Sequence, residues 1–234
     1  MQAVILAAGK GSRMGALTES TPKALLELFK QPLLQYELDT LPDYVDEVVI
    51  IVGYLGHLIQ QRFGGEYKGK RLLYVEQDVL DGTAGALWRA RDILKDRFIV
   101  MMADDLYGKE DIERCVAKAG WVELIQERDA IHAKGKVELD KHGNIARIIE
   151  GNHGETRGLL GTNLFVLDTR VFDCPLIAKT EGSKEFGLPQ TVIAGAKQLG
   201  IPFQPMIGTS WLEITSPEDL KKAEQILEWG EEKK

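Results

Sequence analysis

Residues 3–15 read AVILAAGKGSRMG, an apolar run that leads directly into a glycine-rich loop. The apolar part, residues 3–8, is ended by Gly9 and is typical of a strand buried on both faces. Similar runs at residues 47–52, 71–75 and 98–102 predict three further strands, and helical patterns lie between them at residues 33–41, 55–63 and 84–94. This alternation predicts an α/β fold, a Rossmann-like, doubly wound sheet that is mixed, mostly parallel and flanked by helices.

The sequence beyond about residue 126 is less regular. It predicts shorter strands at residues 136–139, 145–149 and 160–167, with a hairpin turn at residues 140–144. A last helix is expected to begin at Ser216 and Pro217 and to run to about Trp229. We therefore expect a single domain over residues 1–234 with two lobes, residues 1–126 and 127–234. No hexapeptide repeat typical of a left-handed β-helix is present in the sequence.

The composition argues against several classes of protein. The chain has 29 Lys and Arg against 36 Asp and Glu, and this net charge of -7 disfavours a nucleic-acid binder held by global charge. Cys115 and Cys174 lack the spacing of a disulfide scaffold or a zinc site, so we expect buried thiols. No apolar segment approaches the roughly 20 residues that span a bilayer, and the N-terminus lacks a basic signal-peptide region. These features predict a cytoplasmic protein that does not bind membranes.

The glycine-rich loop predicts a polyphosphate site. Glycines straight after a buried strand let backbone N–H groups approach a phosphate closely, and Arg13 and Lys23 add positive charge there. The spacing of Gly9, Gly11 and Gly15 does not match the dinucleotide-binding fingerprint, and Lys10 does not stand in the frame of a Walker loop. The loop therefore belongs to neither of these two common nucleotide-binding motifs.

The sequence LAAGKGSRM, with TPKAL a few residues later, resembles the signature loop of the nucleotidyltransferases that join a nucleoside triphosphate to a sugar 1-phosphate and release pyrophosphate. The chain resembles the short form of that family, without a β-helix domain. Further segments resemble the family in the same order along the chain: Gln77 with Gly82, Thr83, Ala84 and Gly85; Asp104 and Asp105; residues 134–138; Glu150; Gly161, Thr162 and Asn163; residues 211–214; residues 217–220. The resemblance implies a glycosyltransferase-A-like fold, with a nucleotide-binding half in residues 1–126 and an acceptor-binding half in residues 127–234.

The resemblance also implies roles for the two cations of the loop. A phosphate oxygen of the acceptor attacks the α-phosphate in line, so the protein mainly positions two anions and spreads the developing charge. Arg13 is expected to hold the β and γ phosphates and the pyrophosphate, and Lys23 to bridge the α-phosphate and the incoming phosphate. The nucleotide is expected to contact residues of the opening loop, namely Leu6, Ala7, Ala8, Gly9, Gly11 and Ser12.

Two polyphosphates approach one another only with a divalent cation, and Mg²⁺ prefers one or two carboxylates together with phosphate oxygens and water. Asp104 and Glu213 are the expected ligands. Asp104 follows the predicted strand at residues 98–102, and open α/β sheets bind ligands at the carboxyl ends of their strands. Glu213 stands where the commoner family pattern has Asp, and Asp105 is a competing ligand.

Base recognition is expected at Gln77, Gly82 and Thr83, since the amide of Gln77 can pair with a pyrimidine edge. The favoured nucleotides are UTP and dTTP. The acceptor is expected to contact Gly135, Glu150 and Asn163. Many family members have Glu-Lys-Pro where this chain has Glu150 and Gly151, so the missing Lys leaves the acceptor open. Arg157 or His153 is a candidate for the missing charge.

Several alternatives stay open at this point. The same opening loop serves CTP-dependent cytidylyltransferases that act on phosphocholine, inositol phosphate or a phosphonate. A cytidylyltransferase of isoprenoid synthesis is disfavoured because its other motifs are not found, and a molybdopterin guanylyltransferase because its Lys lies nearer the loop. Retention of Arg13, Lys23 and Asp104 disfavours a nucleotide sensor without catalysis. The sequence has no signature of an oligomeric interface.

Overall fold

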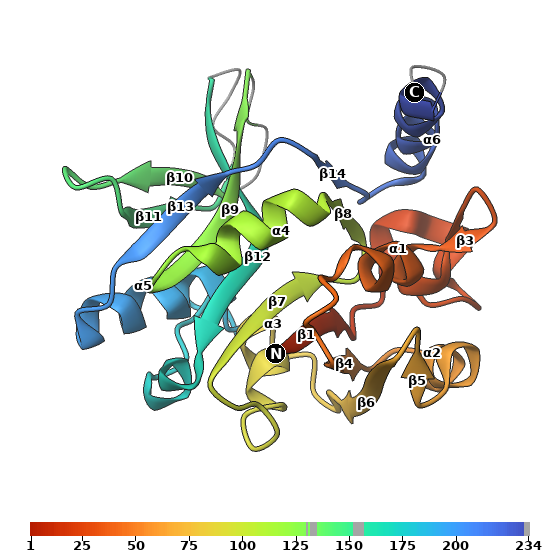
Figure 1. Cartoon of the computed structure of the whole chain (residues 1–234), viewed down its shortest axis with the longest axis horizontal. Helices are drawn as coiled ribbons and strands as arrows, with labels where there is room; N and C mark the ends of the chain where they lie inside the picture. Colours follow the sequence, from red (N-terminus) through yellow and green to blue (C-terminus); the bar gives the residue numbers. More distant parts are fainter. Residues whose placement is uncertain (130, 132–134, 152–156, 232–234) are drawn as a thin grey trace.

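The computed structural model describes residues 1–129, 131, 135–151 and 157–231, and its centre is a mixed sheet (Figure 1). The strands follow the order β11-β10-β12-β7-β1-β4-β6-β5, and β9 pairs with both β12 and β13. The first half of the chain contributes β1 (Gln2–Ala7), β4 (Glu47–Val52), β5 (Glu66–Tyr67), β6 (Lys70–Glu76) and β7 (Arg97–Met102). Of these, β6, β4, β1 and β7 lie side by side in that order and run parallel to one another.

The second half of the chain extends the same sheet. It contributes β9 (Trp121–Arg128), β10 (Lys136–Leu139), β11 (Ile145–Ile149), β12 (Gly158–Asp168) and β13 (Phe203–Ile207). Strand β12 lies antiparallel to β7 and so joins the two halves into one sheet. The expected fold class, an α/β sheet flanked by helices, is therefore confirmed.

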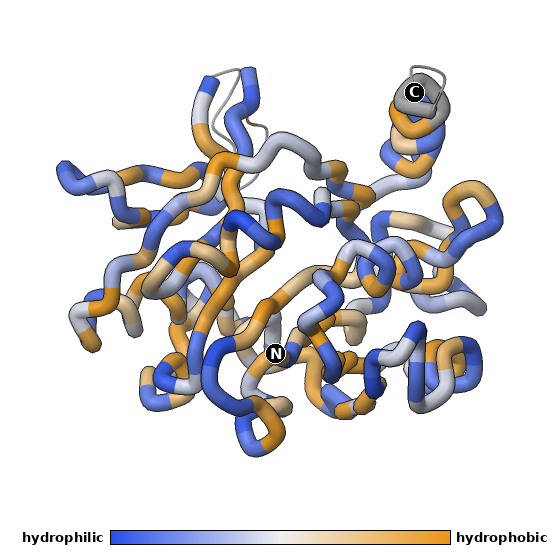
Figure 2. The backbone as a smooth tube through the Cα atoms, viewed as in Figure 1, coloured by the Kyte–Doolittle hydropathy of each residue, from blue (hydrophilic) through white to orange (hydrophobic). Residues whose placement is uncertain are grey.

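Helices cover both faces of the sheet, and β1 is accordingly apolar at every position after Gln2. Ala3 and Ile5 pack in a cluster with α1 (Leu33–Thr40), α2 (Gly56–Phe63) and α4 (Lys109–Ala117). The alternate residues Val4 and Leu6 pack in a second cluster with α3 (Thr83–Trp88) and α5 (Leu188–Leu199). A strand buried on both faces needs this continuous apolar run. Figure 2 shows the hydrophobic residues concentrated along the central strands.

The C-terminal helix α6 (Pro217–Glu231) packs against the first half of the chain (Figure 1). Ala223 of α6 belongs to a third apolar cluster with Met14, Leu28 and Leu33. Most of the remaining short elements lie around this cluster and the adjoining loops: η1 (Ser12–Thr18), η2 (Lys23–Leu25), β2 (Glu27–Leu28), β3 (Gln31–Pro32), β8 (Asp105–Tyr107) and β14 (Trp211–Glu213). The last one, η3 (Thr169–Asp173), packs against α5 in the second cluster. The chain thus returns to its own N-terminal loop after completing the sheet.

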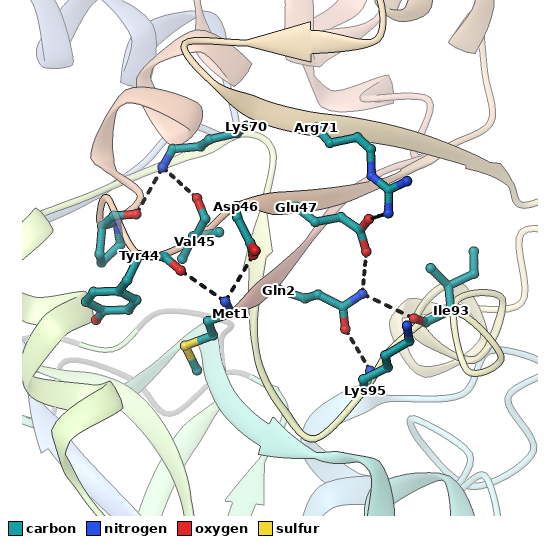
Figure 3. A network of polar contacts seen from close by, with 11 residues as sticks. Met1, Gln2, Tyr44, Val45, Asp46, Glu47, Lys70, Arg71, Ile93 and Lys95 are labelled. Carbon is teal, nitrogen blue, oxygen red and sulfur yellow. Dashed lines mark hydrogen bonds and ion pairs between the residues drawn. The ribbon is translucent and has the colours of Figure 1, made fainter.

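Polar contacts fix the first strand at its N-terminal end (Figure 3). The amino group of Met1 donates to the carbonyl of Tyr44 and to the carboxylate of Asp46, at 3.0 Å each. The amino group of Lys70 donates to the carbonyl of Val45 at 2.8 Å, and Glu47 forms an ion pair with Arg71. These contacts hold β1, β4 and β6 in register.

The seven strands predicted from apolar runs are present, each within two residues of its expected ends. The helix expected at residues 84–94 ends at Trp88, because the following N–H groups bond to carbonyls three residues back, as Ile93 does to Ala90. Helices α4 and α5 and strands β9 and β13 were not predicted. In α4 the buried side chains are only Asp111, Ile112 and Cys115. Its apolar face is therefore too narrow to be recognised as a helical pattern in the sequence.

Both cysteines are free and buried, as expected. Among the described helices, none combines the length and the apolar character that a membrane crossing requires.

Candidate active site

Three adjoining cavities lie at the carboxyl ends of β1 and β7. We call them the glycine-loop cavity (about 220 Å³), the Gln77 cavity (about 320 Å³) and the Glu150 cavity (about 250 Å³). Arg13 lines both the glycine-loop and the Glu150 cavities, and Thr83 and Lys179 line both the Gln77 and the Glu150 cavities. The cavities therefore form one continuous cleft, at the position where open α/β sheets bind ligands.

The described residues expected to bind nucleotide, acceptor or metal line this cleft, apart from the alternatives Asp105 and Arg157. The glycine-loop cavity is lined by Leu6, Ala7, Gly9, Gly11, Ser12, Arg13, Lys23 and Asp104. The Gln77 cavity is lined by Ala8, Gln77, Gly82 and Thr83, together with Leu6 and Gly9. The Glu150 cavity is lined by Gly135, Glu150, Asn163 and Glu213, together with Arg13 and Thr83.

The glycine loop connects β1 to η1 through a residue that must be glycine. Gly11 has a left-handed backbone conformation, with φ of 63°, and a Cβ there would lie 3.0 Å from the Cβ of Lys23. The hydroxyl of Thr18 donates to the carbonyl of Gly11 at 3.0 Å, and the N–H of Met14 donates to the same oxygen at 2.9 Å. Glycine therefore allows Lys23 to pack directly against the loop.

Lys23 is buried at the floor of the glycine-loop cavity, where it forms an ion pair with Asp104. Its side chain is 9% exposed and that of Asp104 is 26% exposed. Asp104 lies in the turn after β7, and the N–H of Ala103 donates to the carbonyl of Leu6, which ties this turn to β1. The lysine and the carboxylate, 81 residues apart in sequence, thus meet at the same point of the cavity.

Asp105 lies away from the cleft. Its carboxylate is buried and accepts hydrogen bonds from the indole N–H of Trp211 at 3.2 Å and from the hydroxyl of Tyr107 at 3.3 Å. Burial and the nearby charge of Asp104 raise the pKa of Asp105 to about 8, although the bond from Trp211 lowers it. Asp105 therefore supports the pairing of β8 with β14 and lines none of the three cavities.

The amide of Gln77 is already oriented by the protein. Its Nε2 donates to the carboxylate of Asp81 at 2.8 Å and to the carbonyl of Gly82 at 3.1 Å. In this orientation Oε1 is the atom of the amide that remains to accept a hydrogen bond from a ligand.

Gly82 was expected to let a base lie against the backbone. The structure gives a different reason for the glycine, because a Cβ there would lie 2.4 Å from the carbonyl oxygen of Phe186. The backbone of Phe186 donates to Asp81 at 2.7 Å and accepts from Ala84 at 3.1 Å, while the hydroxyl of Thr83 accepts from the N–H of Leu188 at 3.0 Å. These hydrogen bonds hold the segment before α5, at residues 186–188, against residues 81–84 at the start of α3.

This fastened segment positions Lys179. The chain folds back on itself between Ile177 and Gly187, with the N–H of Lys179 donating to the carbonyl of Glu185 at 2.8 Å. Lys179 consequently lies where the Gln77 and Glu150 cavities meet. Its side chain is 49% exposed, and its amino group is 3.8 Å from the carboxylate of Glu185.

The Glu150 cavity brings together residues from five strands or strand ends, namely β9, β10, β11, β12 and β14. The N–H of Gly161 donates to the carbonyl of Gly135 at 3.3 Å. The pairing of β12 with β9 shifts register between Gly161 and Phe165, and within this bulge Asn163 has a left-handed conformation with φ of 58°. Asn163 and Glu150 line the same cavity as a result.

Glu123 of β9 lines the Glu150 cavity and was not predicted. It is fully buried, and neither carboxylate oxygen has a hydrogen bond of standard geometry from the residues that the structure describes. Burial and the charge of Glu150 raise the pKa of Glu123 well above its usual value, and the backbone N–H of Asn163 only partly opposes this. The sequence carried one signal, a charged residue within the otherwise apolar run of residues 121–125.

The two candidates for the missing cation have different outcomes. Arg157 is exposed, forms an ion pair with Glu127 at 2.9 Å and lines none of the three cavities. His153 lies outside the described residues. Lys179, which sequence reasoning missed, is the lysine that lines the Glu150 cavity.

Asp104 and Glu213 line adjacent cavities, both of which Arg13 also lines. Glu213 is held in place because β14 pairs with β8 and sets it opposite Asp105. No group of three or more His, Cys, Asp or Glu side chains in the described part of the chain is arranged to hold a metal ion. Two carboxylates beside a phosphate-sized cavity nevertheless suit Mg²⁺, which completes its shell with phosphate oxygens and water.

Comparisons with known proteins agree with this arrangement. The family model described as nucleotidyl transferase matches residues 2–228. The chain is 28% identical to the UTP–glucose-1-phosphate uridylyltransferase AglF of Haloferax volcanii, with 97% of each chain covered. It is 28% identical to the choline-phosphate cytidylyltransferase of Streptococcus pneumoniae, covering 97% of this chain and 98% of that protein. It is 29% identical to the bifunctional protein GlmU of Methanocaldococcus jannaschii, and it spans 54% of that protein's length.

The fold also resembles solved structures. A putative glucose-1-phosphate thymidylyltransferase from Bacillus anthracis, in complex with a sucrose, superimposes with a TM-score of 0.79 at 23% identity. The similarity covers 97% of this chain and 94% of that chain.

Proposed function

Because the chain belongs to the nucleotidyl transferase family, we propose that it transfers a nucleoside monophosphate from a nucleoside triphosphate to a sugar 1-phosphate and releases pyrophosphate. The observation that carries this proposal is the continuity of the cleft. One cavity holds the glycine loop with Arg13 and Lys23, and it joins a second cavity of hydroxyl-binding and carboxylate groups through Arg13. The similarity to AglF, over nearly the full length of both chains, supports a sugar 1-phosphate as the acceptor.

In the proposed reaction, a phosphate oxygen of the acceptor attacks the α-phosphate and the bond to the β-phosphate breaks. An acceptor phosphate is already ionised at neutral pH, so the reaction needs no general base, and catalysis depends on positioning and charge. Lys23 lies at the floor of the glycine-loop cavity, where its amino group can contact the α-phosphate and the incoming phosphate. Arg13 lines both cavities and can hold the β and γ phosphates as pyrophosphate leaves.

We propose Mg²⁺ as the metal, held by Asp104 and Glu213. Bound Mg²⁺ would neutralise phosphate charge that Arg13 and Lys23 alone do not balance. Without the metal, Asp104 forms an ion pair with Lys23. Substrate binding therefore requires Asp104 to release Lys23, which then becomes available to the phosphates.

UTP and dTTP are the proposed nucleotides. Since Nε2 of Gln77 donates hydrogen bonds to Asp81 and Gly82, Oε1 is the amide atom that accepts a hydrogen bond from the base. An acceptor oxygen matches the N3–H donor of uracil and thymine.

Lys179 is the proposed replacement for the lysine that many relatives have after Glu150. It lies between the Gln77 and Glu150 cavities, where the acceptor phosphate must approach the nucleotide.

We also propose that the protein acts in the cytoplasm, where nucleoside triphosphates and sugar 1-phosphates are metabolites.

The test is a matrix of pyrophosphate release with Mg²⁺ present. The rows are UTP, dTTP, CTP, GTP and ATP, and the columns are 1-phosphates of glucose, N-acetylglucosamine and mannose, with phosphocholine and inositol phosphate. We expect release in the UTP or dTTP row with a sugar 1-phosphate, abolished by EDTA and by Lys23→Ala. Pyrophosphate release only in rows other than UTP and dTTP, or only with non-sugar acceptors, would refute this assignment.

A CTP-dependent cytidylyltransferase is the second candidate. Among the described residues that line the Glu150 cavity, Glu123, Glu150 and Glu213 outnumber Arg13 and Lys179. This acidic lining favours a positively charged acceptor such as phosphocholine. The support for this candidate among relatives is the choline-phosphate cytidylyltransferase, which matches this chain over 97% of its length. Release of pyrophosphate from CTP and phosphocholine, with no release from UTP and any sugar 1-phosphate, would establish it.

A further inference from the structure

The carboxylate of Glu123 is the most unusual polar group in the described part of the cleft. It comes from the first half of β9, in the register position opposite Phe165 of β12, and it is fully buried while lining the Glu150 cavity. Neither of its oxygens has a hydrogen bond of standard geometry from the described residues. The backbone N–H of Asn163 acts on this carboxylate, but one N–H leaves most of its acceptor sites without a donor. A buried carboxyl group in that state destabilises the folded protein, and a ligand in the cavity can supply the missing hydrogen bonds.

Two glycines make room for this carboxylate and for Glu150. A Cβ at Gly161 would lie 2.5 Å from Oε1 of Glu123, and a Cβ at Gly135 would lie 3.5 Å from Oε1 of Glu150. The two glycines are themselves joined by the hydrogen bond from Gly161 to Gly135. The backbone of β12 and the start of β10 therefore hold both glutamates at the same end of the Glu150 cavity.

The Glu150 cavity is electrically polarised along its length. Arg13 is shared with the glycine-loop cavity and Lys179 with the Gln77 cavity, so the positive charges stand on the side of the nucleotide. Among the described residues, Glu123, Glu150 and Glu213 line the Glu150 cavity alone. Since Glu213 is assigned to Mg²⁺ in the proposed reaction, Glu123 and Glu150 are the acidic groups that remain for the acceptor. The charge of Glu150 also acts on Glu123 and, with burial, disfavours its ionised form when no ligand is bound.

This arrangement matches a molecule with a negative charge at one end and a positive, hydrogen-bond-donating group at the other. The phosphate of an acceptor occupies the side lined by Arg13 and Lys179 in the proposed reaction. A primary ammonium group has three N–H donors and a positive charge, which satisfies a buried carboxylate better than a neutral hydroxyl does. An acetylated amine has no charge and a single donor.

We propose that the acceptor is a sugar 1-phosphate bearing a primary amine, whose ammonium group is bound by Glu123 together with Glu150. This inference rests on the proposed nucleotidyl transfer. It adds a specificity-determining residue, Glu123, and a class of acceptor to that function. The transfer step itself is unchanged, because the ammonium is bound and does not react.

The test compares acceptors that differ only in one substituent. Glucosamine 1-phosphate, glucose 1-phosphate and N-acetylglucosamine 1-phosphate carry an amine, a hydroxyl and an acetylated amine on the same ring. Phosphoethanolamine, which has the ammonium without the ring, is a fourth arm. We expect kcat/KM to be at least about 10-fold higher with the amine than with the hydroxyl, the scale of one hydrogen bond to a charged group.

Glu123→Gln is the decisive variant, since it keeps the shape of the side chain and removes its charge. It is expected to lower kcat/KM for glucosamine 1-phosphate by roughly 10- to 100-fold and to change the value for glucose 1-phosphate by less than about 3-fold. Glu66→Gln is the matched control, because Glu66 is an exposed residue of β5 that lines none of the three cavities. Glu150→Gln, at the cavity edge, provides a second variant should Glu123→Gln fail to fold.

Calorimetric binding of glucosamine 1-phosphate to the wild-type protein and to Glu123→Gln is measured in parallel, since it does not depend on turnover. Preference for the hydroxyl or the acetylated amine would overturn the inference and leave the proposed function standing. An equal effect of Glu123→Gln on all acceptors would overturn it as well. Faster turnover of phosphoethanolamine than of the amino sugar would reject the sugar ring. If no acceptor gives pyrophosphate, the proposed function fails. The binding measurement then tests the inference separately, and equal binding of glucosamine 1-phosphate to the wild-type protein and to Glu123→Gln would overturn it too.

Discussion

The amino group of Lys23 and the carboxylate of Asp104 form an ion pair at the floor of the glycine-loop cavity, where β1 and β7 end side by side. Each of these two groups has a separate partner in the proposed reaction, phosphate for the lysine and Mg²⁺ for the carboxylate. Phosphate and Mg²⁺ would therefore compete with this ion pair, so its opening is linked to substrate binding.

Replacing Lys23 by Ala is expected to lower kcat by about 100-fold or more, the scale seen when one preorganised transition-state donor is removed. Arg13 cannot compensate, because it is exposed and Lys23 is buried beside the loop. Steady-state rates of pyrophosphate release measure the effect. Lys197→Ala, at an exposed position of α5, is the control and should retain the wild-type rate. A Lys23→Ala variant with a near-normal rate would remove Lys23 from the reaction.

Asp104→Asn is expected to lower turnover by about 100-fold or more and to raise the Mg²⁺ concentration needed for half-maximal rate, since a carboxylate ligand is lost. Because Lys23 competes for the same carboxylate, Mg²⁺ should also bind the wild-type protein more tightly when the nucleoside triphosphate is present. Titration calorimetry with and without UTP measures this difference. Asp92→Asn, at an exposed site outside the cleft, serves as the control. Equal Mg²⁺ affinity in Asp104→Asn and the wild-type protein would exclude Asp104 as a ligand.

Lys179→Ala is expected to raise KM for the acceptor by about 10-fold, with a smaller change in KM for the nucleotide. The side chain is half exposed, so solvent screens part of its attraction for a phosphate. Lys184→Ala is a closely matched control, because Lys184 lies in the same hairpin, is exposed and lines none of the three cavities. Equal kinetic effects of the two variants would show that Lys179 acts only through general surface charge.

The sequence patterns identified the elements that local chemistry determines and missed those that depend on distant contacts. The strand of Gln2–Ala7 is evident because it is apolar at every position after Gln2. Strand β9 was missed because Glu123 interrupts its apolar pattern, and this charged residue is tolerated there only because it faces a cavity. The bulge that places Asn163 in the same cavity also has no local signal, since it arises from the pairing of β12 with β9.

Lys179 illustrates the same limit within the site. Its place in the cleft depends on the hydrogen bond between the N–H of Phe186 and the carbonyl of Asp81, two residues more than a hundred positions apart. The motif residues Arg13, Lys23 and Asp104 could be selected from the sequence because each follows a recognisable strand or loop. A cation on a hairpin fastened by backbone bonds offers no comparable pattern.

Glu37 predicts a pH dependence of stability that is separate from activity. It is fully buried in α1, and neither carboxylate oxygen has a hydrogen-bond partner among the described residues. Burial, followed by the charges of Asp105 and Asp104, raises the pKa of Glu37 well above 4.5. The folded protein thus keeps a proton at pH values where the unfolded chain has released it, so the free energy of unfolding falls as pH rises above about 4.5, with a slope of up to about 1.4 kcal/mol per pH unit.

Glu37→Gln removes this titration, and its stability relative to the wild-type protein should therefore increase as pH rises. Urea unfolding of both proteins at a series of pH values between about 4 and 8 measures the difference, which is taken at each pH so that other titrating groups cancel. Glu66→Gln, at an exposed position of β5, controls for the loss of a single negative charge. If the free energies of unfolding of the wild-type protein and Glu37→Gln change equally with pH across this range, Glu37 has the same pKa in the folded and unfolded chains. Burial then does not raise its pKa.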